Sequence, residues 1–143
     1  MKYGTPFFVF LILFINFFFG CNAGTTKHAE INYGYSNKIS ENEIKSAVDI
    51  VIKDFKYFIG CDLRKLWYDE AVSNSEIEDY LLYGKGSIND IKKENIIILL
   101  SDFYVDSSGG DGSFEPNSTY ENWMWILIRE KNTANWVIDD WGK

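Results

Sequence analysis

Residues 39–60 read ISENEIKSAVDIVIKDFKYFIG, and this stretch decides the fold prediction. Ser40 is followed three residues later by Glu43, which is the spacing of a capping box at a helix N-terminus. Gly60 matches the glycine that commonly follows a helix C-terminus. Between them the apolar residues recur at steps of three and four, which places them on one helix face: Ile44, Ala47, Val48, Val51, Ile52, Phe55, Phe58 and Ile59. We therefore expect a long N-terminal helix of about five turns that packs on an apolar surface.

Two shorter helices are expected after this one. In CDLRKLWYDE, Leu63, Leu66 and Trp67 have helical spacing and follow an aspartate that can cap a helix. The stretch SNSEIEDYLLYG, from Ser73 to Gly84, repeats the Ser-x-x-Glu pattern before an apolar run. The sequence therefore predicts a short second helix and then a short surface helix.

From Ile96 the pattern changes from helical to extended. IIILLSDFYV, at residues 96–105, is rich in β-branched and aromatic side chains and predicts a strand. Residues 120–130 and 135–141 flank a short turn and predict a hairpin. Its expected cross-strand pairs are Arg129 with Trp136, Leu127 with Ile138, and Met124 with Trp141. We expect a cation–π contact in the first pair.

These elements predict one α+β domain at residues 40–143, with the helices on one face of a curved antiparallel sheet. The order of elements resembles the NTF2-like, or cystatin-like, superfamily, in which a curved sheet wraps a long helix and often leaves a cone-shaped pocket. Three segments are similar to small bacterial lipoproteins of this fold: GCDLRKLWYDE, LLSDFYVDSSGGDGSFEPNSTYENWMWILIR and WVIDDWGK. The resemblance covers the whole predicted domain and implies a fold and a location, but no chemistry.

Residues 1–20 differ from the rest of the chain. Lys2 is followed by an apolar run at residues 7–19 that holds seven of the eleven Phe. This is the layout of a cleaved secretory signal peptide. The run is shorter than the roughly 20 apolar residues that a membrane span needs, so an uncleaved anchor is the weaker interpretation.

Cys21 follows the apolar run directly. Gly20 and Cys21 match the lipobox of bacterial lipoproteins, whereas the two Phe before them depart from its pattern. The resemblance implies cleavage before Cys21, a diacyl lipid on its sulfur and anchoring to the membrane. Ordinary cleavage after Ala23, which would leave a secreted protein without lipid, stays open.

Residues 21–39 are polar, contain several glycines and show no sustained period, so we expect a flexible tether. Without residues 1–20 the chain has 13 basic and 21 acidic residues, a formal charge of −8. This balance disfavours nucleic acid as a partner, because Lys and Arg carry binding to phosphates. We expect no cofactor. If Cys21 is lipidated, Cys61 has no disulfide partner, and we expect it to be a buried apolar side chain.

A small, flexible and acidic stretch, SSGGDGSFEP, connects the first strand to the hairpin. Asp106, Asp111 and Glu115 offer oxygen ligands of the kind that Ca²⁺ binds. Their spacing departs from an EF-hand loop, whereas the three glycines suit a turn with positive φ. We therefore expect this loop to turn the chain, and a metal site is the weaker hypothesis.

Large aromatic and sulfur-containing side chains gather in the hairpin. Trp123 and Trp125 are expected on one face of its first strand, and Tyr120, Met124 and Trp141 on the other. Such side chains form a core or line a pocket, since indoles stack on sugars and on apolar ligands. Only one face can lie under the long helix, so the other needs a cover, which is the remaining helices, a ligand or a partner.

Asp102 and Tyr104 alternate onto one face of the strand at residues 96–105. Some NTF2-like enzymes use a pocket carboxylate as a general base and a Tyr as a donor to a developing oxyanion. The pair could act in this way only if it faces the cone, and its neighbours Ile98 and Leu100 favour an inward direction. A solvated position is the alternative.

These features predict an extracytoplasmic, membrane-anchored binding or protein-interaction module. One alternative is a pocket enzyme that uses Asp102 and Tyr104. The other is a structural or inhibitory partner of an envelope protein. The exposed sheet face would then bind that protein or a second copy of the chain.

Overall fold

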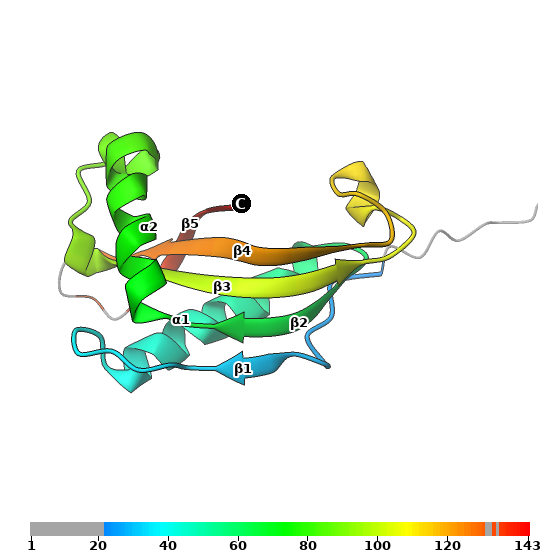
Figure 1. Ribbon diagram of the computed structural model, residues 1–143, viewed down its shortest axis with the longest axis horizontal. Coiled ribbons are helices and arrows are strands. Elements are labelled where there is room, and N and C mark those ends of the chain that lie inside the picture. The colour runs from blue at the N-terminus through cyan, green and yellow to red at the C-terminus, as the bar shows by residue number, and fades with distance from the viewer. Residues whose placement is uncertain (1–21, 131–132, 134) are drawn as a thin grey trace, which may run out of the picture.

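Five strands lie side by side in chain order in the computed structural model, which describes residues 22–130, 133 and 135–143. β1 runs parallel to β2, and each later neighbour is antiparallel (Figure 1). The strands are β1 (Glu30–Asn32), β2 (Cys61–Trp67), β3 (Ile96–Val105), β4 (Ser118–Ile128) and β5 (Val137–Gly142). With the helices α1 (Glu41–Asp54) and α2 (Glu70–Tyr83), the described residues form the predicted α+β class. No helix among them is long and apolar enough to span a bilayer.

The N-terminus of α1 confirms the predicted capping box. The Ser40 hydroxyl accepts a hydrogen bond from the Glu43 N–H at 3.3 Å, and the Glu43 carboxylate accepts one from the Ser40 N–H at 2.8 Å. The helix is shorter than expected, because it ends at Asp54 and a 3₁₀ turn, η1 (Phe55–Tyr57), follows. Its buried residues belong to the predicted apolar stripe: Ile44, Ala47, Val48 and Val51.

The segment before α1 supplies the hydrogen-bond partners that a helix continuing to Gly60 would have found within itself. In a continued α-helix, the Lys56 carbonyl would accept from the Gly60 N–H. Instead, the Lys56 carbonyl accepts from the Gly24 N–H at 3.0 Å, and the Gly60 N–H donates to the Asn22 carbonyl at 2.7 Å. Gly60 has φ = 69°, a left-handed conformation that turns the chain into β2.

The segment expected to be a flexible tether, residues 21–39, pairs with the sheet where the structure describes it. The Thr25 N–H donates to the Cys61 carbonyl, and the Thr25 carbonyl accepts from the Leu63 N–H, each at 2.9 Å. β1 then continues this parallel edge along β2. The tether prediction was wrong for these residues, because their pairing partner is remote in sequence and strand formation depends strongly on such context.

β2 replaces the short helix that the spacing of Leu63, Leu66 and Trp67 predicted. A bulge between Leu63 and Lys65 shifts the alternation of the strand by one residue. Leu63 and Leu66 therefore both face the core, although they are three residues apart, and both are fully buried. A three-residue step between apolar residues is also a helical signature, which is why the prediction was wrong here.

α2 is longer than the predicted surface helix and begins at Glu70. Its N-cap is Asp69 rather than Ser73, and the Asp69 carboxylate accepts from the Val72 N–H at 2.9 Å. Ser73 lies within the helix, buried against the sheet, where its hydroxyl accepts from the Ile98 N–H at 3.1 Å. α1 and α2 pack on opposite faces of the sheet, so the prediction that the helices share one face was wrong (Figure 1).

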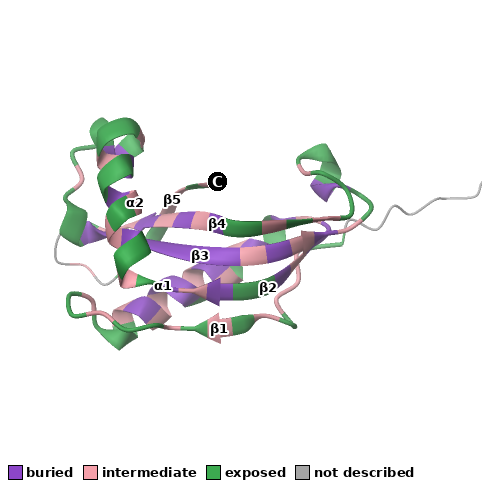
Figure 2. Ribbon diagram, viewed as in Figure 1, coloured by how far each residue is buried: buried purple, intermediate pink, exposed green. Residues whose placement is uncertain are grey.

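The main core lies between α1 and the sheet, and β3 is buried along most of its length (Figure 2). Its centre is aromatic, with the Phe55 ring centroid 5.9 Å from that of Phe103 and 6.2 Å from that of Trp125. Trp125 is fully buried, and its indole N–H donates to the Ser101 hydroxyl at 2.8 Å. A smaller core beneath α2 contains Ile77, Tyr80, Ile96 and Ile98.

The hairpin of β4 and β5 is tied to the start of α1 at one end. Leu127 pairs with Ile138, as predicted. The Arg129 guanidinium lies 4.4 Å from the centroid of the Trp136 ring, which confirms the expected cation–π contact. Arg129 also forms an ion pair with Glu43, whose carbonyl accepts from the Trp136 indole N–H at 3.2 Å. The turn and the helix therefore hold each other in place.

The register at the other end of the hairpin differs from the prediction. A bulge just before Leu127 shifts the pairing, so Trp141 lies opposite Trp125 rather than Met124. The Trp141 ring consequently joins the aromatic core, with its centroid 5.6 Å from that of Trp123.

The Glu43 carboxylate gives the fold a specific pH dependence. Hydrogen bonds from Ser40 and Arg129 lower the pKa of Glu43 from its ordinary value of 4.5 to about 2. Because the folded-state pKa is the lower one, the charged carboxylate stabilises the fold above pH 4.5, and this contribution is lost as the pH falls toward 2. We predict that Glu43→Gln lowers the free energy of unfolding by about 1 kcal/mol at pH 7 and by progressively less below pH 4.5. Urea unfolding across this pH range measures the difference, and a difference that stays constant would contradict the prediction.

Candidate functional site

One half of the sheet face that carries α2 is open. Along β3, Ile96 and Ile98 pack under α2, whereas Asp102 and Tyr104 lie beyond it on the same face and are only partly buried. The open half forms a groove of about 440 Å³ across β1 to β4. Its lining residues are Glu30, Asn32, Lys65, Trp67, Asp102, Glu121 and Asn122.

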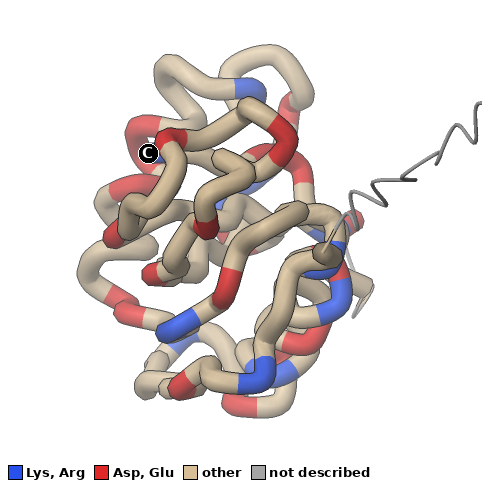
Figure 3. Tube along the Cα trace, turned by 90° about the vertical axis from the view of Figure 1, so that its right-hand side faces the viewer, with Lys and Arg blue, Asp and Glu red and all other residues tan. Residues whose placement is uncertain are grey.

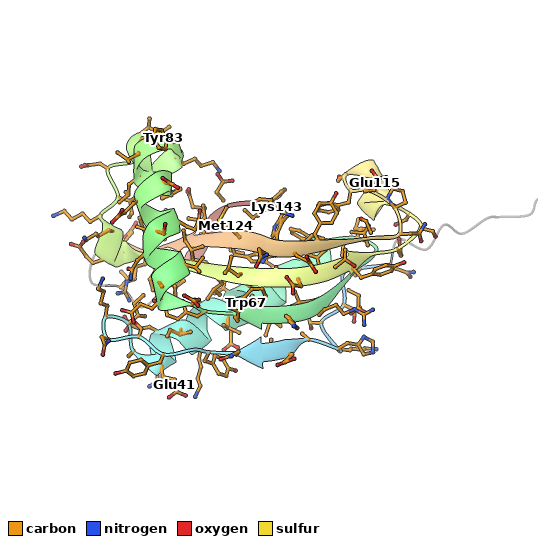
Figure 4. The ribbon with its side chains drawn as sticks, viewed as in Figure 1. Glu41, Trp67, Tyr83, Glu115, Met124 and Lys143 are labelled. Carbon is orange, nitrogen blue, oxygen red and sulfur yellow. The ribbon has the colours of Figure 1, made fainter. Side chains whose placement is uncertain are left out.

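The sheet register places the groove residues in two adjacent rows. Glu30 of β1 pairs with Lys65 of β2, which pairs with Asp102 of β3. In the next row, Asn32 of β1 pairs with Trp67 of β2, and Figure 4 labels the Trp67 side chain. Directly opposed residues on one face lie about 5 Å apart, so a single small ligand can contact the charged row and the indole together.

A bulge in β4, the fourth strand of the groove, forms its edge. The register shift between Ser101 and Phe103 leaves Glu121 and Asn122 opposite Asp102. Asn122 has φ = 55°, and its N–H donates to the Asp102 carboxylate at 2.9 Å. Asn adopts this left-handed conformation more readily than most residues, so the notable feature here is the bulge, and bulges are over-represented next to active sites. The Asp102 side chain therefore stabilises the bulge at the rim of the groove.

The groove is charged, and its charges are not neutralised by close pairing. Glu30, Asp102 and Glu121 supply three carboxylates, and Lys65 supplies one ammonium group, which gives a formal charge of −2. Among the described residues, no ion pair within 4.0 Å joins Lys65 to these carboxylates. The carboxylates and the ammonium group are therefore available to a ligand beside the indole.

A second cavity, of about 390 Å³, lies beside α2. Its lining includes Tyr68 and part of the 3₁₀ turn η3 (Lys93–Asn95), and burial raises the pKa of the Tyr68 hydroxyl. Several of its polar groups are engaged within the fold. The Ser73 hydroxyl accepts from the β3 backbone, and the Lys38 ammonium donates to the Asn74 side chain at 3.5 Å. The groove, which combines a bulge with charges that are not closely paired, is therefore the stronger candidate site.

Comparison with known proteins assigns most of the chain to one family. The model of a domain of unknown function, DUF4829, matches residues 52–142. The chain belongs to the DUF4829 family. The match runs from the end of α1 through β5, so five groove residues lie within the DUF4829 region and two, Glu30 and Asn32, lie before it. No curated protein and no solved structure matches the chain.

Within the DUF4829 region, the structure separates the two catalytic candidates. Asp102 lines the groove, whereas Tyr104 does not, and the Tyr104 hydroxyl lies 3.5 Å from the Asn117 amide oxygen. Both side chains lie on the open face, away from α1. They therefore do not face the aromatic core, which lies where the resemblance would place a cone-shaped pocket.

The aromatic ligand candidates lie mostly in the two cores. Trp123 and Trp125 are 7% and 0% exposed and pack under α1, and the Trp123 indole N–H is buried without a hydrogen-bond partner among the described residues. Tyr120 was predicted on the other face, but the bulge in β4 places its ring 5.7 Å from that of Trp123. Met124 packs in the smaller core under α2. Trp141 is the one of these indoles with a large exposed fraction, 49%.

The three acidic residues of the loop do not gather around one point. Asp106 accepts from the hydroxyl and the N–H of Ser108, at 2.5 and 2.8 Å, which lowers the pKa of Asp106. The Asp111 carboxylate accepts from the Ser113 hydroxyl. The Glu115 N–H donates to the Tyr120 hydroxyl oxygen. Within the described part of the chain, no set of three or more His, Cys, Asp or Glu could hold a metal ion.

The structure describes one of the two cysteines, Cys61. Cys61 is 2% exposed, as predicted, and burial raises the pKa of its thiol to about 12. Cys21, the predicted lipidation site, lies outside the described residues.

Sequence reasoning identified Asp102 and missed the other groove residues. Lys65 and Trp67 fell in the segment predicted as a helix, and Glu30 and Asn32 in the predicted tether. The cross-strand register alone brings these residues together, and no local spacing encodes it. The polar–apolar alternation of Lys65 and Leu66 was the one local sign of a strand, and the bulge before Lys65 masked it.

Burial separates the tryptophans that stabilise the fold from those that a ligand could reach. We predict that Trp125→Ala lowers the free energy of unfolding by about 3–5 kcal/mol, because it empties the centre of the core. Trp141→Ala should cost only about 1–2 kcal/mol, since it removes ring contacts with Trp123 and Phe58 at a half-exposed site. Urea unfolding of both variants provides the measurement. Equal costs would show that Trp125 is not the core residue described here.

Proposed function

We propose that this protein is an extracytoplasmic, lipid-anchored binding module. The apolar run at residues 7–19 and the Gly20–Cys21 pair that follows it support export and lipidation. A diacyl lipid supplies two chains, which is the number needed for stable anchoring. If cleavage instead follows Ala23, the same domain is secreted.

The bulge at Asn122 is the single observation that carries the binding proposal. Bulges re-aim side chains and are over-represented next to active sites. Here the bulge lies at the rim of a groove, and the Asp102 carboxylate stabilises it with one oxygen. We infer that the groove beside Trp67 and Lys65 is the ligand site.

A neutral sugar is the ligand class that this groove fits best. Trp67 lines the groove, and an indole is a side chain on which a pyranose ring can stack. The amides of Asn32 and Asn122 and the carboxylate of Asp102 can exchange hydrogen bonds with hydroxyl groups. The formal charge of −2 disfavours phosphates and carboxylates. Because the groove crosses four strands, it has room for more than one sugar unit.

The finer fold assignment is also a proposal, namely that the domain is a divergent NTF2-like, or cystatin-like, fold. Its support is the antiparallel meander from β2 to β5, one face of which packs on α1. α2 on the opposite face and the parallel strand β1 are additions to that simple pattern.

A protein partner is the second candidate function. The C-terminal end of α2 and the turn after it expose Leu82, Tyr83 and Ile88, with exposed fractions of 65%, 83% and 86%. Exposed apolar side chains of this kind suit a second copy of the chain or an envelope protein. An enzyme that uses Asp102 and Tyr104 has less support, because Tyr104 lies outside the groove.

Thermal unfolding in the presence of glucose, N-acetylglucosamine and short oligomers of each tests the sugar proposal. A ligand at about 100 times its Kd adds roughly 2.7 kcal/mol, which raises the Tm by several degrees. We predict that Trp67→Ala weakens binding roughly tenfold or more, because the stacking surface is lost. Asp102→Asn should weaken binding too, while it keeps an acceptor for the Asn122 N–H.

Trp141→Ala is the matched control, because it removes a half-exposed indole from the opposite face of the sheet. It should leave sugar binding unchanged. Equal losses in Trp67→Ala and Trp141→Ala, or no stabilisation by any of these sugars, would overturn the assignment. A shift with Ca²⁺ that EDTA reverses would direct attention to the loop instead.

A further inference from the structure

The chain enters the fold without a spacer. The carbonyl of Asn22, the first described residue, accepts from the Gly60 N–H at 2.7 Å, and the Gly24 N–H donates to the Lys56 carbonyl at 3.0 Å. A Cβ atom added at Gly24 would lie 2.1 Å from the Phe55 carbonyl oxygen, so the backbone is in close contact with the turn that follows α1. The segment is therefore bound to the domain from Asn22 onward.

This close attachment limits where a lipid on Cys21 can lie. Cys21 and Asn22 are adjacent, and Cα atoms joined by a trans peptide bond are about 3.8 Å apart. No flexible residue then separates the lipid from the fold. We propose that the domain lies directly against the lipid headgroups, with the end around Asn22 facing the bilayer. This inference rests on the lipid-anchor part of the proposed function and is independent of the sugar groove.

The anchor-side end comprises Asn22, residues 56–60 and residues 106–114. The loop belongs to this end, because the Asp106 N–H donates to the Gly60 carbonyl at 2.9 Å. Tyr57 is 68% exposed here, and the Lys56 ammonium lies 4.8 Å from the centroid of its ring. An exposed Tyr beside a Lys suits the headgroup region, where amphipathic aromatic and long basic side chains are favoured.

Charge does not drive this contact. Figure 3 views the molecule from the anchor side and shows positions of both signs. Without residues 1–20 the formal charge is −8, which gives no general attraction to anionic lipid. The short covalent connection is therefore the feature that would hold this end at the membrane.

The opposite end of the sheet would face away from the bilayer. β3 begins under α2 and ends beside Gly60, and its ten residues span about 33 Å. Tyr83, the last residue of α2, lies at the far end, whereas Glu115 lies at the anchor side (Figure 4). The groove lies between these ends, so its ligand would be held close to the membrane surface.

Labelling of two matched variants of the full chain tests the orientation. Tyr57→Cys and Tyr83→Cys each replace a well-exposed Tyr, at the anchor side and at the far end. Cys61 contributes little background, because it is buried and burial raises the pKa of its thiol to about 12. In spheroplasts, a bulky polyethylene glycol maleimide should modify the Tyr57→Cys variant several-fold more slowly than the Tyr83→Cys variant.

A linker provides the control. Ten Gly and Ser residues inserted between Cys21 and Asn22 reach about 17 Å on average, which should make the two labelling rates equal. Equal rates in membrane-bound protein without the linker would overturn the orientation. Recovery of both variants in the soluble fraction would overturn the lipid anchor and the orientation together. Neither result bears on the groove, whose sugar binding is measured separately.

Discussion

The Asn122 N–H donates to the Asp102 carboxylate, and this hydrogen bond lies at the bulge of β4 that shapes both the core and the candidate site. It stabilises a bulge that allows β4 to hold an extra residue opposite β3. Tyr120 and Trp123 consequently both face the aromatic core, although they are three residues apart. The same bulge places Glu121 at the rim of the groove. One bond from a side chain to the backbone therefore couples the packing on one face of the sheet to the shape of the other.

The sequence predicted the elements whose signals are local. The capping box at Ser40 and the β-branched run of β3 each lie within one short segment, and the structure confirms both. The errors occur where a bulge breaks the two-residue period, since a bulge makes buried residues recur at three-residue steps that imitate a helix. Leu63 and Leu66 were misread in this way, and Trp141 was assigned the wrong partner for a related reason.

The candidate site could be predicted only in part, because its residues come from four strands. Asp102 was identified as an acidic residue in an otherwise apolar strand, but Trp67 and Glu30 needed the sheet register to reveal them. β1 also carries no local signal of its own, since its three residues gain their conformation from pairing with β2. This N-terminal segment is structurally central: it hydrogen-bonds to the turn that follows α1 and contributes Glu30 and Asn32 to the groove. It would also connect the domain to the proposed lipid on Cys21.

The central claim is that the groove on the open face binds a ligand. Amide and indole NMR shifts of the ¹⁵N-labelled protein, titrated with N-acetylglucosamine oligomers, test it most directly. We predict that the shifts concentrate at the Trp67 indole N–H and at the amides of Lys65 and Asn122, because these groups line the groove. Shifts concentrated instead at Tyr68 and Ser73, which line the cavity beside α2, would contradict it.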